Sequence, residues 1–334
     1  MIESPDPLDS EVSVSVDVNE SGVTAKSKSR LISGLDRLLG NLSDWANVRL
    51  EGDIRARRAT STANEKVIGA LADYAVDKLK VDPGFAERAL ASHVDGILRS
   101  QNNREKVAQR AIEDLRREPP SDEQARSGPD EISAEVLDRL ETYSSGASTE
   151  ELQERWGRVL ASEIRKPGAF SLKVLRIIDE LDSDTAALFE DFATHRVGEF
   201  VPKVLVGEFP YDRQLKLVDA GLLVDPNFGQ SSSFSEIDIE ANKYWFWRAN
   251  QSLICLPRAD FTPKREFGSK SAISTHDNKP AVPIYILTSA GIAITTILPP
   301  VDNSRPYYLR AKEKYPTASR WKVSADEKSV ARIE

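Results

Sequence analysis

The chain has 334 residues, of which 45 are Lys or Arg and 53 are Asp or Glu, so its formal net charge is −8. At roughly 150 residues per domain, this length predicts two or three domains. The acidic balance excludes a general basic coat for nucleic acid or for an anionic membrane. A single cysteine excludes an internal disulfide and any zinc site built from several cysteines.

The N-terminal residues do not have the pattern of a secretory signal, because they are acidic and contain no apolar run. Together with the lone cysteine, this predicts a cytoplasmic protein. Residues 1–28 are rich in Ser, Asp and Glu, and we expect them to form a disordered tail.

Residues 29–118 predict a helical N-terminal region. Apolar residues recur at helical spacing over 30–46, and residues 47–80 predict an Ala-rich, charged helix whose narrow seam suits a hairpin or self-association. A Pro-Gly break at 83–84 precedes a further helical pattern. Its apolar residues are expected to face inward: Phe85, Ala89, Leu90, Val94, Ile97 and Leu98. Residues 119–130, PPSDEQARSGPD, have the composition of a linker.

Short helical patterns predict a second helical domain over residues 131–198. Ser148 and Glu151 have the spacing of a capping box at the start of one helix. Pro167 and Gly168 are expected to end that helix, and two further short helices follow.

Residues 199–300 have the outline of a winged-helix module. The predicted elements are an edge strand, a helix, two antiparallel strands, and a strand–turn–helix unit, over residues 200–206, 211–220, 234–240, 243–256 and 283–298. Leu215 and Val218 are expected to point inward from the helix, and Gly221 to provide its C-terminal cap. Turns are expected at Ala249-Asn250-Gln251, which would fold the segment 243–256 back on itself, and at Ser289-Ala290-Gly291.

The second helix of such a module presents its polar side chains to the bases. Arg213, Gln214 and Lys216 are therefore the candidate nucleic-acid-binding residues, although Asp212 and Asp219 would repel phosphate. The C-terminal tail, 301–334, mixes basic and aromatic residues. This mixture suits either stacking on a single strand or packing of the tail back across the domain.

The segment from Pro280 to Pro300 carries no charge. Its prolines leave only residues 284–298 uninterrupted, which is shorter than the ~20 apolar residues of a membrane-spanning helix. A buried strand followed by a buried helix is favoured, and a membrane-associated segment is the alternative.

Tyr244-Trp245-Phe246-Trp247 is apolar on both faces when it is extended. A strand buried on both faces is one interpretation. An exposed pair of Trp245 and Trp247 at a protein interface is the other.

Motifs for catalysis are missing from the sequence. It has no G-x-G-x-x-G and no P-loop, so a phosphate-binding loop is not indicated. It also has no G-x-S-x-G, the motif that carries the nucleophilic serine of α/β-hydrolases. Cys255 lies in an apolar run, which is typical of a small core residue. His93 has no Cys, Asp or Glu at the spacing of metal ligands. His195 follows a predicted helix, where the helix dipole favours a histidine. We therefore expect no enzymatic site, no metal and no cofactor.

Residues 148–192 carry a specific pattern of apolar, capping and turn residues. Its matching positions are Ser148, Glu150, Glu151, Gln153, Trp156, Val159, Leu160, Ala161, Pro167, Gly168, Phe170, Ser171, Leu181, Asp182, Thr185, Ala186, Leu188 and Phe189. This pattern resembles the bacterial family catalogued as domain of unknown function 2806, and further similarity extends over about residues 30–300. The segment is also similar, more loosely, to abortive-infection alpha proteins. These resemblances imply a fold and a possible link to phage defence, but no catalytic residue.

These observations predict a mainly α protein, α+β overall, with long N-terminal helices followed by a helical bundle fused to a winged-helix-like α/β module. We expect a regulatory or interaction protein that binds an unknown protein partner or self-associates through its N-terminal helices. A winged-helix regulator that binds DNA or RNA is the alternative, and membrane binding is not expected.

Overall fold

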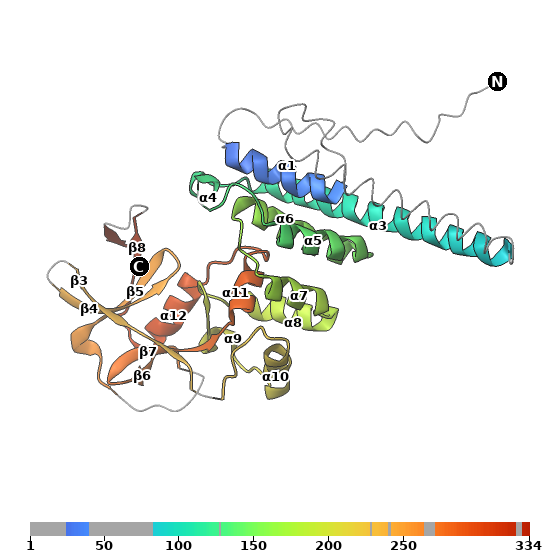
Figure 1. Cartoon of the computed structure of the whole chain (residues 1–334). Coiled ribbons are helices and arrows are strands. Elements are labelled where there is room, and N and C mark those ends of the chain that lie inside the picture. Colours follow the sequence, from blue (N-terminus) through green and yellow to red (C-terminus); the bar gives the residue numbers. More distant parts are fainter. Residues whose placement is uncertain are drawn as a thin grey trace, which may run out of the picture. The chain divides into compact units, whose positions relative to one another are not determined.

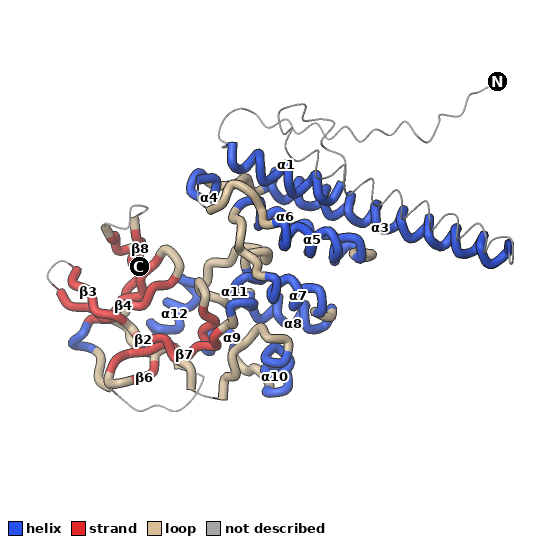
Figure 2. The backbone as a smooth tube through the Cα atoms, viewed as in Figure 1, coloured by secondary structure: helices blue, strands red, loops and turns tan. Residues whose placement is uncertain are grey.

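The computed structural model describes residues 25–39, 83–126, 128–227, 229–239, 242–263, 271–324 and 329–334. The chain divides into two compact units, Met1–Gly168 and Ala169–Glu334. The boundary falls inside the helical domain predicted for 131–198, because the first helices of that stretch pack on helices that precede them in the chain. All described strands lie in the second unit (Figure 2), so the fold is α+β overall.

The first unit is built from helices (Figure 1). They are α1 (Ala25–Leu39), α3 (Pro83–Arg117), α4 (Asp122–Arg126), α5 (Ala134–Gly146) and α6 (Glu150–Arg165). α3 packs on α1, α5 and α6 through the half of its length that follows Asn103. The buried side chains between these helices include Leu38, Val107, Leu140, Trp156 and Leu160.

The N-terminal predictions are tested only in part. α1 overlaps the helix predicted over 30–46 as far as Leu39, and it begins at Ala25, within the predicted tail. The rest of that tail and the Ala-rich helix predicted for 47–80 lie outside the described residues. At the start of α6, the N-cap is Thr149, whose Oγ1 accepts a hydrogen bond from the backbone N–H of Leu152 at 3.3 Å. The predicted cap at Ser148 is therefore one residue too early.

A buried arginine fixes the connection between α3 and α5. Arg30 on α1 is fully buried. Its Nε and Nη2 donate to the carbonyl oxygen of Pro129 at 3.0 and 2.7 Å, and its Nη1 donates to the carbonyl oxygens of Gln124 and Arg165, both at 3.2 Å. Ala125 is also buried. The stretch predicted as a linker thus contains a short helix, α4, and is held by side-chain hydrogen bonds.

The second unit mixes helices with two antiparallel sheets. Its helices are α7 (Leu172–Glu180), α8 (Ser183–Ala193), α9 (Lys203–Val206), α10 (Tyr211–Asp219), α11 (Ser289–Thr295) and α12 (Ser304–Lys314), with a 3-10 turn at Arg258–Asp260. Its strands are β1 (Phe200–Pro202), β2 (Ser231–Ser233), β3 (Ser235–Ile239), β4 (Asn242–Ala249), β5 (Ser252–Pro257), β6 (Ser274–His276), β7 (Lys279–Ile286), β8 (Ser319–Val323) and β9 (Val330–Arg332).

Strand β7 is the centre of one sheet, where it pairs with β1, β2 and β6. The other sheet has the order β3-β4-β5-β8-β9. The β4–β5 turn lies at Asn250 and Gln251, as predicted, and Asn250 has a φ of 56°, a backbone conformation that asparagine tolerates. Residues 301–334 contribute α12, β8 and β9, so the predicted tail packs back into this unit.

Three local predictions in this unit are corrected. Residues 203–206 form the short helix α9 and not a continuation of the edge strand. Ser289 and the two residues after it form the first turn of α11, because Thr288 caps that helix by accepting from the N–H of Gly291 at 3.0 Å. On α10, the buried residue is Leu217, with no exposed surface, whereas Leu215 is 43% exposed.

The winged-helix arrangement predicted for residues 199–300 is not confirmed. α10 packs on α8, α11 packs on α7, and Leu223 forms a backbone bridge with Leu287. The strands β3, β4 and β5 lie between these bridged residues in sequence and pair with β8 and β9 in the five-stranded sheet.

Candidate functional site

α3 and α6 approach each other closely where α6 has a glycine. A Cβ atom placed on Gly157 would lie 2.5 Å from Cβ of Arg110 and 3.0 Å from the backbone nitrogen of Ala111. Only glycine therefore fits the observed separation of the two helices. This contact anchors the C-terminal half of α3.

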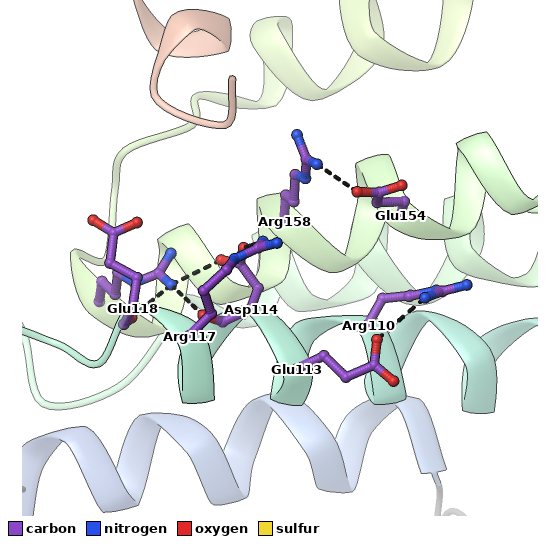
Figure 3. Close-up of polar contacts among 8 residues, drawn as sticks. Arg110, Glu113, Asp114, Arg117, Glu118, Glu154 and Arg158 are labelled. Carbon is purple, nitrogen blue, oxygen red and sulfur yellow. Dashed lines mark hydrogen bonds and ion pairs between the residues drawn. The ribbon is translucent and has the colours of Figure 1, made fainter. Parts of the chain in front are cut away.

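A buried ionic network lies at the end of the same interface (Figure 3). Arg165 Nη2 and Asp114 Oδ2 are 2.8 Å apart, and their side chains are 10% and 12% exposed. The second oxygen of Asp114 lies 2.5 Å from Nη2 of Arg117, and this hydrogen bond raises the pKa of the Arg117 guanidinium. Arg165 also donates to the carbonyl oxygen of Glu118 through Nε at 2.9 Å.

The network joins α3 to α6. Toward α3, the Arg165 guanidinium donates hydrogen bonds to the carboxylate of Asp114 and to the backbone carbonyl oxygens of Asp114 and Glu118. Two further pairs, Arg110–Glu113 and Arg158–Glu154, lie on the neighbouring turns (Figure 3). Those two pairs each lie within one helix and are partly exposed. Because breaking a buried pair is strongly destabilising, we assign Asp114 and Arg165 the role of holding α3 against α6. Among the described residues, no group of three His, Cys, Asp or Glu side chains is placed to hold a metal ion.

The N-terminal half of α3 carries an exposed apolar stripe, which we call the α3 stripe: Leu90, Val94, Ile97 and Leu98. These side chains are 63%, 44%, 54% and 62% exposed, respectively. They account for four of the eleven described large apolar side chains that are exposed. The prediction that this face lies inward is therefore wrong for these four residues. In Figure 1, α3 extends well past α5, the helix beside it in the first unit.

The length of α3 explains this exposure. α3 has 35 residues, whereas α5 has 13 and α6 has 16. At 1.5 Å per residue, these helices are about 50, 20 and 24 Å long. The shorter helices cover the part of α3 that contains Val107, Ala111 and Ile112. α5 and α6 do not reach the turns of α3 that precede this part, so those turns are not packed against them.

The residues predicted to contact nucleic acid share α10 but differ in their surroundings. Arg213 is exposed. The side-chain amide of Gln214 donates to the carbonyl oxygen of Phe209 at 2.6 Å. Lys216 Nζ lies 3.8 Å from Oδ1 of Asp182, whose pKa is lowered chiefly by hydrogen bonds from Thr185. Two of the three side chains are thus engaged within the unit.

Trp245 and Trp247 are in the core of the second unit. They are 6% and 3% exposed, and the Trp247 indole N–H donates to Oγ of Ser232 at 3.0 Å. Trp247 also packs on Tyr307, with ring centroids 4.8 Å apart. On the opposite face of β4, Tyr244 packs with Trp321. The tryptophan pair is therefore not exposed, whereas the other face of β4, with Tyr244 and Phe246, is partly buried.

Cys255 also lies in the second unit, without exposed surface. Burial raises the pKa of its thiol to about 12. Because the thiolate is the reactive form, we expect Cys255 to be unreactive in the folded protein. Residues 284–298, the uncharged stretch, belong to β7 and α11, and Ile284, Tyr285 and Ile294 are buried. Within the described part of the chain, no helix is both long and apolar enough to cross a membrane.

The comparisons with known proteins bear on the helices that carry the stripe and the network. Residues 87–199 match the family model described as Protein of unknown function (DUF2806). These are 113 of the 334 residues, from the first turns of α3 to the residue before β1. The predicted resemblance to this family is supported over that range, and the similarity to abortive-infection proteins is not confirmed. No curated protein and no solved structure matches the chain.

The sequence interpretation found the stripe residues but misjudged their surroundings. Periodicity identifies an apolar face and does not say what covers it. A signal was nevertheless present, because a single helix across residues 85–117 is about twice as long as the helix predicted to begin near residue 150. Such a mismatch leaves part of the longer helix without a neighbour of equal length.

Proposed function

We propose that this chain is a non-enzymatic interaction protein whose docking surface is the α3 stripe. The observation that carries the proposal is the exposure of Leu90, Val94, Ile97 and Leu98 on consecutive turns of one helix. A continuous apolar strip of this kind is the surface that helix-recognising partners bind. Scattered single apolar residues would not support the same conclusion.

The physical properties of α3 suit this role. Complete burial of an aliphatic side chain stabilises by about 1.5–3 kcal/mol, so four half-exposed side chains offer about 4 kcal/mol in total. The helix is already formed, and its C-terminal half is held by Asp114, Gly157 and Arg165. A partner therefore does not need to order the backbone, which reduces the free-energy cost of binding.

The test is site-specific photocrosslinking in the cells that make the protein. A photoreactive phenylalanine analogue at Val94 is expected to give covalent protein adducts after irradiation, because Val94 lies at the middle of the stripe. The same analogue at Ser92 is the matched control, since Ser92 is also exposed but lies on the opposite side of α3. Equal labelling at the two positions, or none at Val94, would count against the proposal.

Nucleic-acid binding by α10 is a second candidate function. It is supported by the exposed Arg213 on a helix that precedes the Leu223–Leu287 bridge, in the order of a winged helix. The charges of α10 weigh against it, because Asp212 and Asp219 balance Arg213 and Lys216. The test is a mobility shift with a labelled duplex at low salt, in which Arg213→Ala would have to weaken binding. Identical migration with and without protein would remove this candidate.

A further inference from the structure

The α3 stripe is symmetric about its central residue. Leu90 precedes Val94 by four residues, and Leu98 follows it by four. Ala91 and Ile97 lie three residues before and after it. Glu87 and Gln101, seven residues on either side, end the apolar run with polar side chains. When α3 is turned by 180° about Val94, the two leucines exchange places, and the large Ile97 takes the place of the small Ala91.

We propose that the α3 stripe binds the same stripe of a second copy of this chain, in an antiparallel pair of helices that meet at Val94. This inference rests on the proposed function and names its partner. A two-fold pair uses one patch on both subunits, so the patch must be complementary to itself. The stripe fits that requirement because Leu90 and Leu98 are equally far from Val94, and because the large Ile97 of one copy is placed opposite the small Ala91 of the other.

The antiparallel arrangement predicts three layers of contact. In the central layer, Val94 of one copy meets Val94 of the other. In each outer layer, Ile97 and Leu98 of one copy meet Leu90 and Ala91 of the other, because these residues lie at equal heights on opposite sides of the two-fold axis. Beyond the outer layers, Glu87 of one copy faces Gln101 of the other. Each end of the contact therefore pairs a carboxylate with an amide and not two like charges.

The small size of the stripe sets the expected affinity. Leu90 and Leu98 are eight residues apart, which is about 12 Å along the helix. Stable interfaces usually bury at least about 1,000 Å² in total, and three layers of mostly aliphatic side chains lie at the low end of that range. We therefore expect a concentration-dependent dimer with a dissociation constant on the order of 100 µM. Residues 40–82 of the same chain are the other occupant to be tested, because they lead directly into α3.

Cysteine crosslinking of the full-length chain tests the arrangement. The native Cys255 is buried and unreactive, so an introduced cysteine is the only accessible thiol among the described residues. Val94→Cys at about 100 µM is expected to form a disulfide-linked dimer under mild oxidation, because the two Val94 positions face each other. Ser92→Cys, on the far side of the helix, is the matched control and is expected to stay monomeric.

Two further variants fix the orientation. In an antiparallel pair, the Leu90 positions of the two copies are about 12 Å apart along the axis, which is beyond the reach of a disulfide. Leu90→Cys and Leu98→Cys are therefore each expected to crosslink poorly alone and well when mixed. Efficient crosslinking of Leu90→Cys with itself would overturn the antiparallel arrangement. In sedimentation, Val94→Glu is expected to weaken association at least tenfold, and Ser92→Glu less than twofold.

The reactivity of Val94→Cys with a maleimide separates the remaining outcomes. A monomer that reacts rapidly would overturn the proposed dimer and leave the stripe open to another protein, as the proposed function requires. A monomer that is protected from the reagent would overturn both the proposed dimer and the proposed docking function, because the stripe would then be covered from within its own chain. A crosslinked dimer that reacts with the maleimide only after reduction supports both the dimer and the docking function.

Discussion

Gly157→Ala tests the close approach of α3 and α6 directly. The added Cβ would lie 2.5 Å from Cβ of Arg110 and 3.0 Å from the backbone nitrogen of Ala111. Neither atom is the tip of a flexible side chain, so the helices must separate to accept the methyl group. Overpacking of a core costs about 1–3 kcal/mol, and these rigid neighbours favour the upper end of that range.

The helix propensity of alanine acts in the opposite direction. Replacing a glycine within a helix by alanine stabilises the helix by about 1 kcal/mol. We therefore expect a net loss of about 2 kcal/mol in the free energy of unfolding. The matched control is Gly96→Ala on α3, where nothing lies within 4 Å of the added Cβ. This variant is expected to be as stable as the wild type or up to about 1 kcal/mol more stable.

Urea unfolding followed by circular dichroism at 222 nm measures both changes, because the first unit is described entirely as helices and loops. The expected result is a lower midpoint for Gly157→Ala and an equal or higher midpoint for Gly96→Ala, with unchanged slopes. A Gly157→Ala protein as stable as the wild type would refute the reasoning. So would an equal loss in both variants, because the loss would then not come from the contact between α3 and α6.

Three other predictions concern buried or titrating groups. Asp114→Ala leaves Arg165 buried without its carboxylate and is expected to lower the free energy of unfolding by about 3 kcal/mol. Asp114→Asn is expected to lose less. An alanine variant that loses less stability than the asparagine variant in denaturant titrations would contradict this prediction. The thiol of Cys255, with a pKa of about 12, is expected not to react with an aromatic disulfide at pH 8 until the protein unfolds. The pKa of Asp182 is lowered by hydrogen bonds from Thr185, so its stabilisation is present above the ordinary carboxyl pKa and is lost as pH falls through the folded value. Asp182→Ala should therefore lower the thermal midpoint at pH 7, and the difference from the wild type should shrink as the pH falls below the ordinary carboxyl pKa.

Local sequence patterns were sufficient to identify several elements of the fold. The two-residue turn at Asn250 and Gln251, the strand on either side of it, and the glycine after α10 follow from backbone preferences that depend on few neighbours. The burial of Trp245 and Trp247 follows from a strand that is apolar on both faces. In each case the determining residues lie within about ten positions of one another.

Features that depend on distant neighbours could not be read from the sequence in the same way. On α10, helical spacing allows either Leu215 or Leu217 to face inward, and only the packing of the unit selects Leu217. The exposure of the α3 stripe depends on where α5 and α6 end relative to α3. The partners of Asp114 and Arg165 are 51 residues apart in the chain, and no local pattern pairs them.

The hydrogen bonds of Arg30 have a consequence for the order of folding. Their acceptors, the carbonyl oxygens of Gln124, Pro129 and Arg165, are 94, 99 and 135 residues further along the chain. A guanidinium buried without acceptors is strongly unfavourable, so we expect α1 to reach its final packing only when those carbonyl oxygens are in place. During synthesis, the first described helix therefore has to wait until residue 165 has left the ribosome, and α1 joins the first unit among its last elements.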